Sequence, residues 1–374
     1  MKQCLSFIIL WVVFSQFSCE KRFSSELLVI GNPAKFEAKS IDVSEFADSI
    51  IYIQIDDSLL LPALGKNFLL VDNYMFFLTK EGLLKYDTKG RFLKKIGIYG
   101  NGPGELKHFY SLVTMNKVSE CLYVYSYPNT IYSYSFEGDF LGSISVDLPH
   151  NAIVTNFYCQ DDCFFFFFAH AWEIGAYPLY WVITDLNGKM KMTKQSDKKK
   201  NGVVSSTRYG GIFSSSCYNH EFISWDLLND TVFHVGSFYE KAAFLWGKGD
   251  FRIVDTDDYS TVEDKRILCS YFIDAKHFLL LRWRNIGSFS AFYTYYDKKE
   301  KKFYKMDDIF INKEVSLSMT TRHFLYFQQN RREYILTQTK ARAVEDVPGA
   351  IAWAIDPDDP EGNPVLVLIR LKDE

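Results

Sequence analysis

The chain contains 374 residues and is rich in aromatic side chains, with 33 Phe and 24 Tyr. Phe and Tyr favour pleated, half-buried surfaces, so this composition predicts a mainly β protein. The formal net charge of -4 argues against nucleic acid as the main partner, because binding a phosphate backbone needs a basic face.

Residues 1–19 differ in composition from the rest of the chain. Lys2 gives a positive start, and a largely apolar stretch follows from Leu5 to Phe17. This stretch is too short to favour a membrane span and has the length of the hydrophobic part of a signal peptide. Cys19 follows the small Ser18, as in lipoprotein signals whose Cys is acylated after cleavage. An ordinary signal peptide cut nearby is the alternative. A lipid on Cys19 would hold the protein to a membrane without a spanning helix.

Five cysteines remain when Cys4 and Cys19 are set aside. An odd number leaves at least one thiol unpaired, which argues against a disulfide scaffold. Cys159 and Cys163 flank a predicted turn and could bridge across a hairpin, but two small core residues are favoured. The sequence offers no second Cys or His pair to complete a zinc site, and no metal site is predicted.

Residues 20–45 are mixed and polar and predict a tether, while residues 46–374 contain a repeated pattern. Each copy has an apolar strand, a short break, a second strand and a turn with Gly, Asn or Asp. The turn glycines recur at roughly 50-residue intervals, which is typical of β-propeller blades. They are Gly90, Gly138, Gly188 and Gly236. The copies cover residues 68–93, 122–141, 164–190, 221–236 and 278–304, and the blade boundaries between Gly236 and Asp297 are the least defined.

The two ends of this region supply a sixth blade. Ile50 to Ile55 and Val365 to Leu371 each read as a strand without a turn partner nearby. Pairing them in one sheet would close a ring and remove two exposed edges. The fold class predicted is therefore all-β, a six-bladed β-propeller closed by its N- and C-terminal strands. A short helix is expected within residues 336–356.

Two motifs resemble a known family. The first is Gly90-Arg-Phe-Leu-Lys-Lys-Ile-Gly97, followed by Gly100-Asn-Gly-Pro-Gly-Glu-Leu106, and the second is the C-terminal run Asp359 to Val367. Both are similar to motifs of the six-bladed β-propeller lipoproteins of Bacteroides-type bacteria, which are related in shape to NHL-repeat proteins. The resemblance implies an exported propeller, and it implies no activity because the family has no assigned catalytic residues.

The glycines of the first motif have a structural interpretation. No Lys-Ser or Lys-Thr follows them, and the context is strand to strand, so they do not predict a phosphate loop. They predict a tight crossing between blades, in which Gly permits the bend, Pro103 stiffens it and Glu105 caps backbone amides. The acidic loops near Asp257 and Asp358 lack the spacing of a calcium site and are interpreted as solvated turns.

Several aromatic and polar residues follow predicted inner strands, where propeller loops ring one mouth of the channel. Such side chains suit a glycan, a peptide or an envelope protein as ligand. Aromatic packing between blades is the alternative explanation. The candidates are Tyr127, Asn129, Trp172, Arg208, Tyr209, Arg282, Trp283 and Arg284.

The sequence predicts no catalytic residue and no cofactor. The function expected is a non-catalytic binding or interaction module, exported to the bacterial envelope as an outer-membrane lipoprotein facing the periplasm or the surface. A structural role in an envelope complex is a further hypothesis for the function. The alternative is a metal-dependent hydrolase, such as a lactonase, with its site in the channel. That enzyme would need polar side chains from several blades to converge, for which Asp72, Asn129, Asp226 and Asn285 are the candidates.

Overall fold

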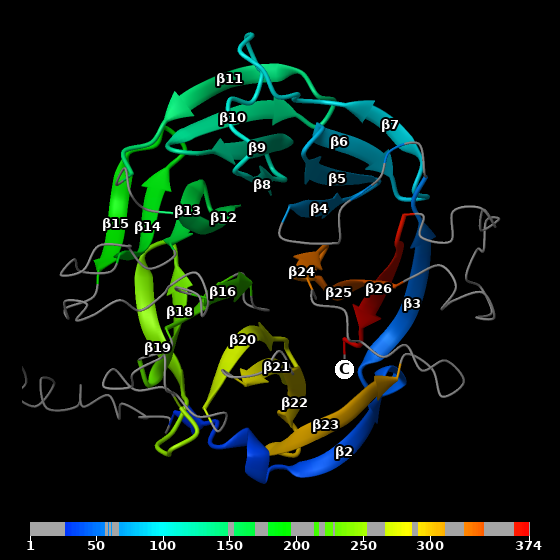
Figure 1. Cartoon of the computed structure of the whole chain (residues 1–374), viewed down its shortest axis with the longest axis vertical. Coiled ribbons are helices and arrows are strands. Elements are labelled where there is room, and N and C mark those ends of the chain that lie inside the picture. Colours follow the sequence, from blue (N-terminus) through cyan, green and yellow to red (C-terminus); the bar gives the residue numbers. More distant parts are fainter. Residues whose placement is uncertain are drawn as a thin grey trace, which may run out of the picture.

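A computed structural model shows six β-sheets arranged as blades in a ring (Figure 1). The prediction of a six-bladed β-propeller is confirmed. The structure describes residues 27–56, 59, 61, 67–148, 153–168, 179–195, 213–216, 221–226, 229–252, 266–285, 291–310, 325–339 and 363–373. Trp172, Arg208, Tyr209 and Cys19 lie outside these residues. No helix in the described part is long and apolar enough to cross a membrane.

Blades 1 to 3 are antiparallel meanders of four strands each. From the centre of the ring outward, blade 1 contains β4 (Phe68–Val71), β5 (Tyr74–Thr79), β6 (Gly82–Asp87) and β7 (Phe92–Lys95). Blade 2 contains β8 (Ser111–Asn116), β9 (Cys121–Ser126), β10 (Thr130–Ser135) and β11 (Phe140–Ser145). Blade 3 contains β12 (Val154–Gln160), β13 (Cys163–Phe168), β14 (Leu179–Asp185) and β15 (Met190–Gln195).

Blades 4 and 5 carry a fifth, outermost strand, and blade 6 has four strands. In the same outward order, blade 4 contains β16 (Phe213–Ser216), β17 (Phe222–Trp225), β18 (Thr231–Gly236), β19 (Tyr239–Leu245) and β1 (Leu28–Val29). Blade 5 contains β20 (Ile267–Asp274), β21 (Phe278–Asn285), β22 (Ala291–Asp297), β23 (Lys302–Phe310) and β2 (Glu37–Asp42). Blade 6 contains β24 (Leu325–Gln329), β25 (Arg332–Thr339), β26 (Val365–Leu371) and β3 (Ala47–Gln54).

The five consecutive Phe residues of β13 show why inner parts of blades are apolar on both faces. All five side chains are fully buried. Because successive residues of a strand point to opposite faces, Phe164, Phe166 and Phe168 pack toward blade 2, whereas Phe165 and Phe167 pack toward blade 4. An alternating polar pattern would leave one of these interfaces without apolar contact.

The ring closes as the sequence predicts. β26 pairs antiparallel with β3, from Val365 opposite Gln54 to Leu371 opposite Ala47. The turn at Gly90 packs on this closing strand, with φ of +84°, and a Cβ atom there would lie 1.8 Å from the carbonyl oxygen of Gln54. Glycine is therefore needed at this position for both conformation and space.

Two expectations differ from the structure. Within the predicted tether of residues 20–45, the strands β1 and β2 belong to the propeller and pair in parallel with β19 and β23. Two 3₁₀ turns, at Pro33–Lys35 and Val43–Glu45, connect these strands to each other and to β3. This N-terminal belt, residues 28–46, runs along the outer edge of blades 4 and 5. The expected helix within residues 336–356 is replaced at its start by β25, and the remainder lies outside the described residues.

The Cys159 and Cys163 thiols are unpaired. The two-residue turn Asp161-Asp162 has φ of 48° and 55°, as expected in a tight hairpin turn. This turn sets Cys159 opposite Phe164 and Cys163 opposite Gln160, so the two cysteines are not cross-strand partners. The preference for small core residues over a bridge agrees with this register.

Glu105 caps the crossing between blades 1 and 2, as expected from its motif. Its Oε2 accepts a hydrogen bond of 2.8 Å from the backbone N–H of Gly102. The hydroxyl of Tyr134 donates to the carbonyl of Gly104 at 2.8 Å and holds the same loop to blade 2.

Replacing Glu105 by Ala is expected to lower the free energy of unfolding by about 1.5 kcal/mol, because a charge-assisted hydrogen bond to the backbone is lost. Urea denaturation of the purified protein measures this change. Glu105→Gln keeps an acceptor oxygen and serves as the control, with an expected loss of less than half as much. Equal losses in both variants would contradict the capping role.

Candidate functional site

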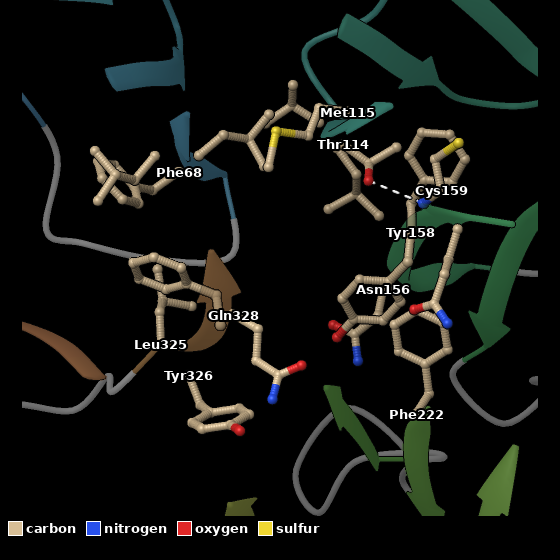
Figure 2. Close-up of a pocket in the computed structure, with 17 residues that line it drawn as sticks. Phe68, Thr114, Met115, Asn156, Tyr158, Cys159, Phe222, Leu325, Tyr326 and Gln328 are labelled. Carbon is tan, nitrogen blue, oxygen red and sulfur yellow. Dashed lines mark hydrogen bonds between the residues drawn. The ribbon is translucent and has the colours of Figure 1, made fainter. Parts of the chain in front are cut away.

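The inner strands enclose a cavity of about 260 Å³ in the centre of the ring (Figure 2). Its walls come from β4, β8, β12 and β24, with Phe222 at the start of β17. The lining residues are Phe68, Leu69, Leu70, Leu112, Val113, Thr114, Met115, Asn156, Phe157, Tyr158, Cys159, Gln160, Phe222, Leu325, Tyr326, Phe327 and Gln328. The size is just below the range of about 300–1,000 Å³ that holds drug-sized ligands.

Aromatic rings form opposite walls of this cavity. Tyr158 stacks on Phe222, with ring centroids 4.5 Å apart and planes inclined by 22°. Tyr326 faces them from β24 (Figure 2). Its hydroxyl donates to Glu333, whose carboxylate also accepts from the backbone N–H of Lys276 at 2.9 Å. The Tyr326 ring is thereby fixed in place beside the cavity.

Amides and a hydroxyl provide the polar part of the lining. Thr114 Oγ1 accepts a hydrogen bond of 2.9 Å from the backbone N–H of Cys159, which joins blades 2 and 3. Figure 2 shows Gln328 reaching from β24 toward Asn156 and Tyr158 on β12. Thr114 and Asn156 are 6% and 3% exposed, so these polar groups are held within the packed inner strands.

The two mouths of the channel are distinct. We name the face where the inner strands begin the start face and the face where they end the end face. At the end face, Lys117 Nζ donates to Asp72 at 2.7 Å and to Asn330 at 2.9 Å. These residues lie in the turns that follow β8, β4 and β24. The contacts tie together the inner turns of blades 2, 1 and 6.

Two of the predicted ligand-binding residues lie at the start face. Tyr127 and Asn129 are in the turn between β9 and β10, next to the start of β8. The Tyr127 ring lies 5.4 Å from the ring of His108 and 6.4 Å from that of Tyr110, and the adjacent Phe109 is 75% exposed. The structure thus shows an aromatic group at this mouth, and a ligand-binding role for it stays a prediction.

The Arg-Trp-Arg segment of β21 is in blade 5, apart from the aromatic group of blade 2. Trp283 is 2% exposed, its Nε1–H donates to Thr294 at 2.9 Å, and its ring lies 5.5 Å from that of Trp246. Trp283 is therefore a core residue between blades and not a residue of the channel mouth. Arg282 and Arg284 are half-buried on the same strand.

The side chains proposed for a metal-dependent enzyme are spread over the molecule. Asp72 is at the end face and Asn129 at the start face. Asp226 accepts a hydrogen bond of 2.9 Å from the Tyr180 hydroxyl, and Asn285 ends β21. Within the described ranges, no group of three or more His, Cys, Asp or Glu side chains is placed to hold a metal ion.

A buried chain of charges joins blades 4 and 5 near the end face. Nδ1 of His234 lies 2.9 Å from Glu221, and Nε2 lies 3.0 Å from Asp274. Lys241 and Lys298 approach the outer oxygens of these carboxylates at 2.8 and 2.6 Å. Burial raises the pKa of Glu221, but hydrogen bonds, including that of Lys241, and the charge of His234 lower this pKa by more. Sequence reasoning missed this group because its members are far apart along the chain.

Cys159 offers a chemical probe of the cavity wall. Burial raises the pKa of its thiol to about 12, so about one thiol in ten thousand is ionised at pH 8. Alkylation by iodoacetamide is expected to be slow at pH 8 and to rise about tenfold for each pH unit up to pH 10, as measured by peptide mapping. The Cys159→Ser variant gives the background. Rapid labelling of Cys159 at pH 7 in the folded protein would contradict this environment.

Comparison with known proteins places the fold in a family. The family described as "Domain of unknown function (DUF4934)" matches residues 29–370. An inferred exported protein from Bacteroides fragilis NCTC 9343 has a similar structure, with a TM-score of 0.60, 15% identity, and coverage of 92% of this chain and 100% of that one. At this identity the likeness shows the fold alone.

Other solved structures are less similar. A protein of unknown function from Bacteroides caccae gives a TM-score of 0.36 at 10% identity, covering 65% of this chain and 81% of that one. An oligogalacturonate lyase in complex with manganese gives 0.42 at 9% identity, covering 82% and 77%. No curated protein matches the sequence. Since the family match extends over most of the propeller, the chain belongs to the DUF4934 family.

Proposed function

We propose that the protein is an exported binding module of the bacterial envelope that holds a small ligand reversibly in its central channel. The observation that carries this proposal is the cavity of about 260 Å³ lined by aromatic rings and carboxamides on the inner strands. A concave, mostly apolar site with a few placed polar groups is the usual form of a small-molecule site. The aromatic group at the start face supports access of the ligand from that side.

Binding without chemistry is the role that this lining supports. Stacking on Tyr158 and Tyr326 and hydrogen bonds from the amides would give affinity and orientation. Because the inner strands are packed on both sides by neighbouring blades, these side chains are held in position before the ligand arrives, which lowers the cost of binding.

The test is a glycan and peptide array on the mature chain from residue 20 onward, which contains every described strand, followed by calorimetry on each ligand found. Tyr158→Leu and Gln328→Leu are expected to weaken binding at least tenfold. Tyr52→Leu and Gln54→Leu on the outer strand β3 are the matched controls and are expected to bind normally. Unchanged affinity in both cavity variants, or ligand recovered as a cleaved product, would overturn the proposal.

The envelope location rests on the N-terminal sequence and on the exported description of the similar Bacteroides fragilis protein. We expect mass spectrometry of the mature protein to find a lipid on Cys19. Cys19→Ala is expected to block processing or to release the protein from the membrane fraction, while Cys121→Ala changes neither. An unmodified mature N-terminus beyond Cys19 would replace the lipoprotein with a plainly secreted protein.

A further inference from the structure

The polar groups on the described walls of the cavity are all uncharged. They belong to residues of blades 2, 3 and 6, and of these groups the Tyr326 hydroxyl is bound to Glu333. The residues are Asn156, Gln160, Gln328, Thr114, Tyr158, Tyr326 and Cys159. A carboxamide presents both donors and an acceptor, and a ligand hydroxyl likewise donates and accepts. The polar lining is therefore suited to a ligand that carries several hydroxyl groups.

Two charged side chains next to the described lining bind other partners. Lys117 binds Asp72 and Asn330 in the turns beyond the inner strands. Glu333 accepts from the hydroxyl of Tyr326 and from the backbone of Lys276, so its carboxylate is engaged beyond the aromatic ring. Lys117 is thus ion-paired at the end face, and the Glu333 carboxylate is hydrogen-bonded on the far side of Tyr326.

This uncharged lining disfavours the binding of a charged ligand. A carboxylate or phosphate placed among amides and aromatic rings gives up its hydration without gaining an opposite charge from the described walls, and this weakens its binding. A neutral ligand gives up much less hydration. Aromatic ring faces carry negative quadrupole density, which attracts the weakly positive C–H groups on the face of a sugar ring, and Tyr158 and Tyr326 place aromatic rings in the lining.

We propose that the ligand of the central channel is a neutral saccharide, and that the channel discriminates against the uronate and phosphate forms of the same sugar. This inference rests on the proposed binding function and specifies its ligand class. Aromatic rings on two sides match the apolar faces of a sugar ring, while the amides match its hydroxyl groups at the edge.

Calorimetry with size-matched sugars tests the inference on the mature chain. The probes are mono- and disaccharides of glucose, galactose and mannose, the corresponding uronates, the 6-phosphates of the monosaccharides, and the uronate methyl esters. We expect at least one neutral sugar to bind, with its uronate and phosphate at least tenfold weaker and its methyl ester restored to within threefold. The methyl ester separates the effect of charge from that of size.

Gln328→Lys provides the matched test from the protein side. A lysine at this position would place a positive charge at the cavity, so the variant is expected to lose affinity for the neutral sugar and to gain affinity for the uronate. Gln54→Lys on β3 is the control and leaves the preference unchanged. Folding of each variant is checked by circular dichroism and by its thermal midpoint.

The outcomes separate the inference from the function on which it rests. Equal binding of neutral and charged sugars, or binding only of peptides in the array, overturns the saccharide inference and leaves the binding module standing. Failure of every array member and every sugar to bind overturns both. Restoration by the methyl ester together with a reversed preference in Gln328→Lys supports the neutral-saccharide site.

Discussion

A chain that ends at Pro364 is expected to lose the cooperative unfolding transition of the propeller. It lacks β26, in which six of seven side chains are 7% exposed or less. Full burial of an aliphatic side chain contributes about 1.5–3 kcal/mol, so the deletion removes about 10 kcal/mol or more. That loss is comparable to the whole stability of a typical domain, about 5–15 kcal/mol. It also leaves β25 and β3 without their shared neighbour.

Circular dichroism during urea titration measures this effect. A chain ending at Lys372 is the control, because it retains β26 and the hydrogen bond from the Lys372 backbone N–H to Phe46. A synthetic peptide of residues 363–374 is expected to restore the transition when added to the shortened chain. An unchanged urea midpoint in the chain ending at Pro364 would show that β26 does not close the ring.

Replacing His234 by Ala is expected to lower the free energy of unfolding by about 3 kcal/mol. The imidazole lies between Glu221 and Asp274, at 2.9 and 3.0 Å, and both carboxylates are buried. Without the ring, the two carboxylates face each other across a cavity. Each carboxylate keeps its contact with Lys241 or Lys298, so the loss comes from two hydrogen bonds to charged groups, each of which contributes about 1.5–3 kcal/mol.

Urea denaturation again gives the measurement, and His277→Ala is the control because His277 is exposed and contacts only a terminal backbone carbonyl. Adding Glu221→Gln and Asp274→Asn to His234→Ala removes the facing charges and is expected to recover about half of the loss. If the triple variant is less stable than His234→Ala alone, hydrogen bonding to the charged carboxylates is not the source of the effect.

The architecture was predictable because each blade repeats one local rule. Apolar strands alternate with turns whose glycines and acidic residues adopt positive φ, as at Gly90 and Asp161-Asp162. The terminal strands β3 and β26 could be paired because neither has a neighbouring partner in the sequence. These signals are local in the chain, or follow from the need to protect strand edges.

The strands of the N-terminal belt were harder to predict from the sequence than the strands of the blades. β2 is polar and largely exposed, with Glu37, Ala38 and Ser40 directed to solvent, so its sequence resembles a linker. It is held in the fold mainly by backbone pairing with β23, and backbone pairing leaves no mark on side-chain composition. Period-two alternation alone could not distinguish such an outer strand from a tether.

The sequence did not predict the cavity, because the candidate ligand-binding residues were placed in loops at the channel mouth and the cavity is lined by inner strands. Asn156 is inside the inner strand β12, and Gln328 is the next-to-last residue of β24. The available signal was therefore a polar residue within or at the end of a largely apolar strand. Trp283 was expected at a mouth because it lies between two arginines, but the alternation of β21 turns it into the core between blades 4 and 5. Which blade brings which residue to the channel depends on the ring geometry, which no local pattern contains.

The position of the N-terminal belt also decides which part of the ring a lipid on Cys19 would be attached to. Leu28 of β1 comes nine residues after Cys19, and this connection can span at most about 30 Å when fully extended. β1 is the outermost strand of blade 4, so a lipid on Cys19 would attach the propeller by its circumference. Blade 4 would then stay within about 30 Å of the lipid surface.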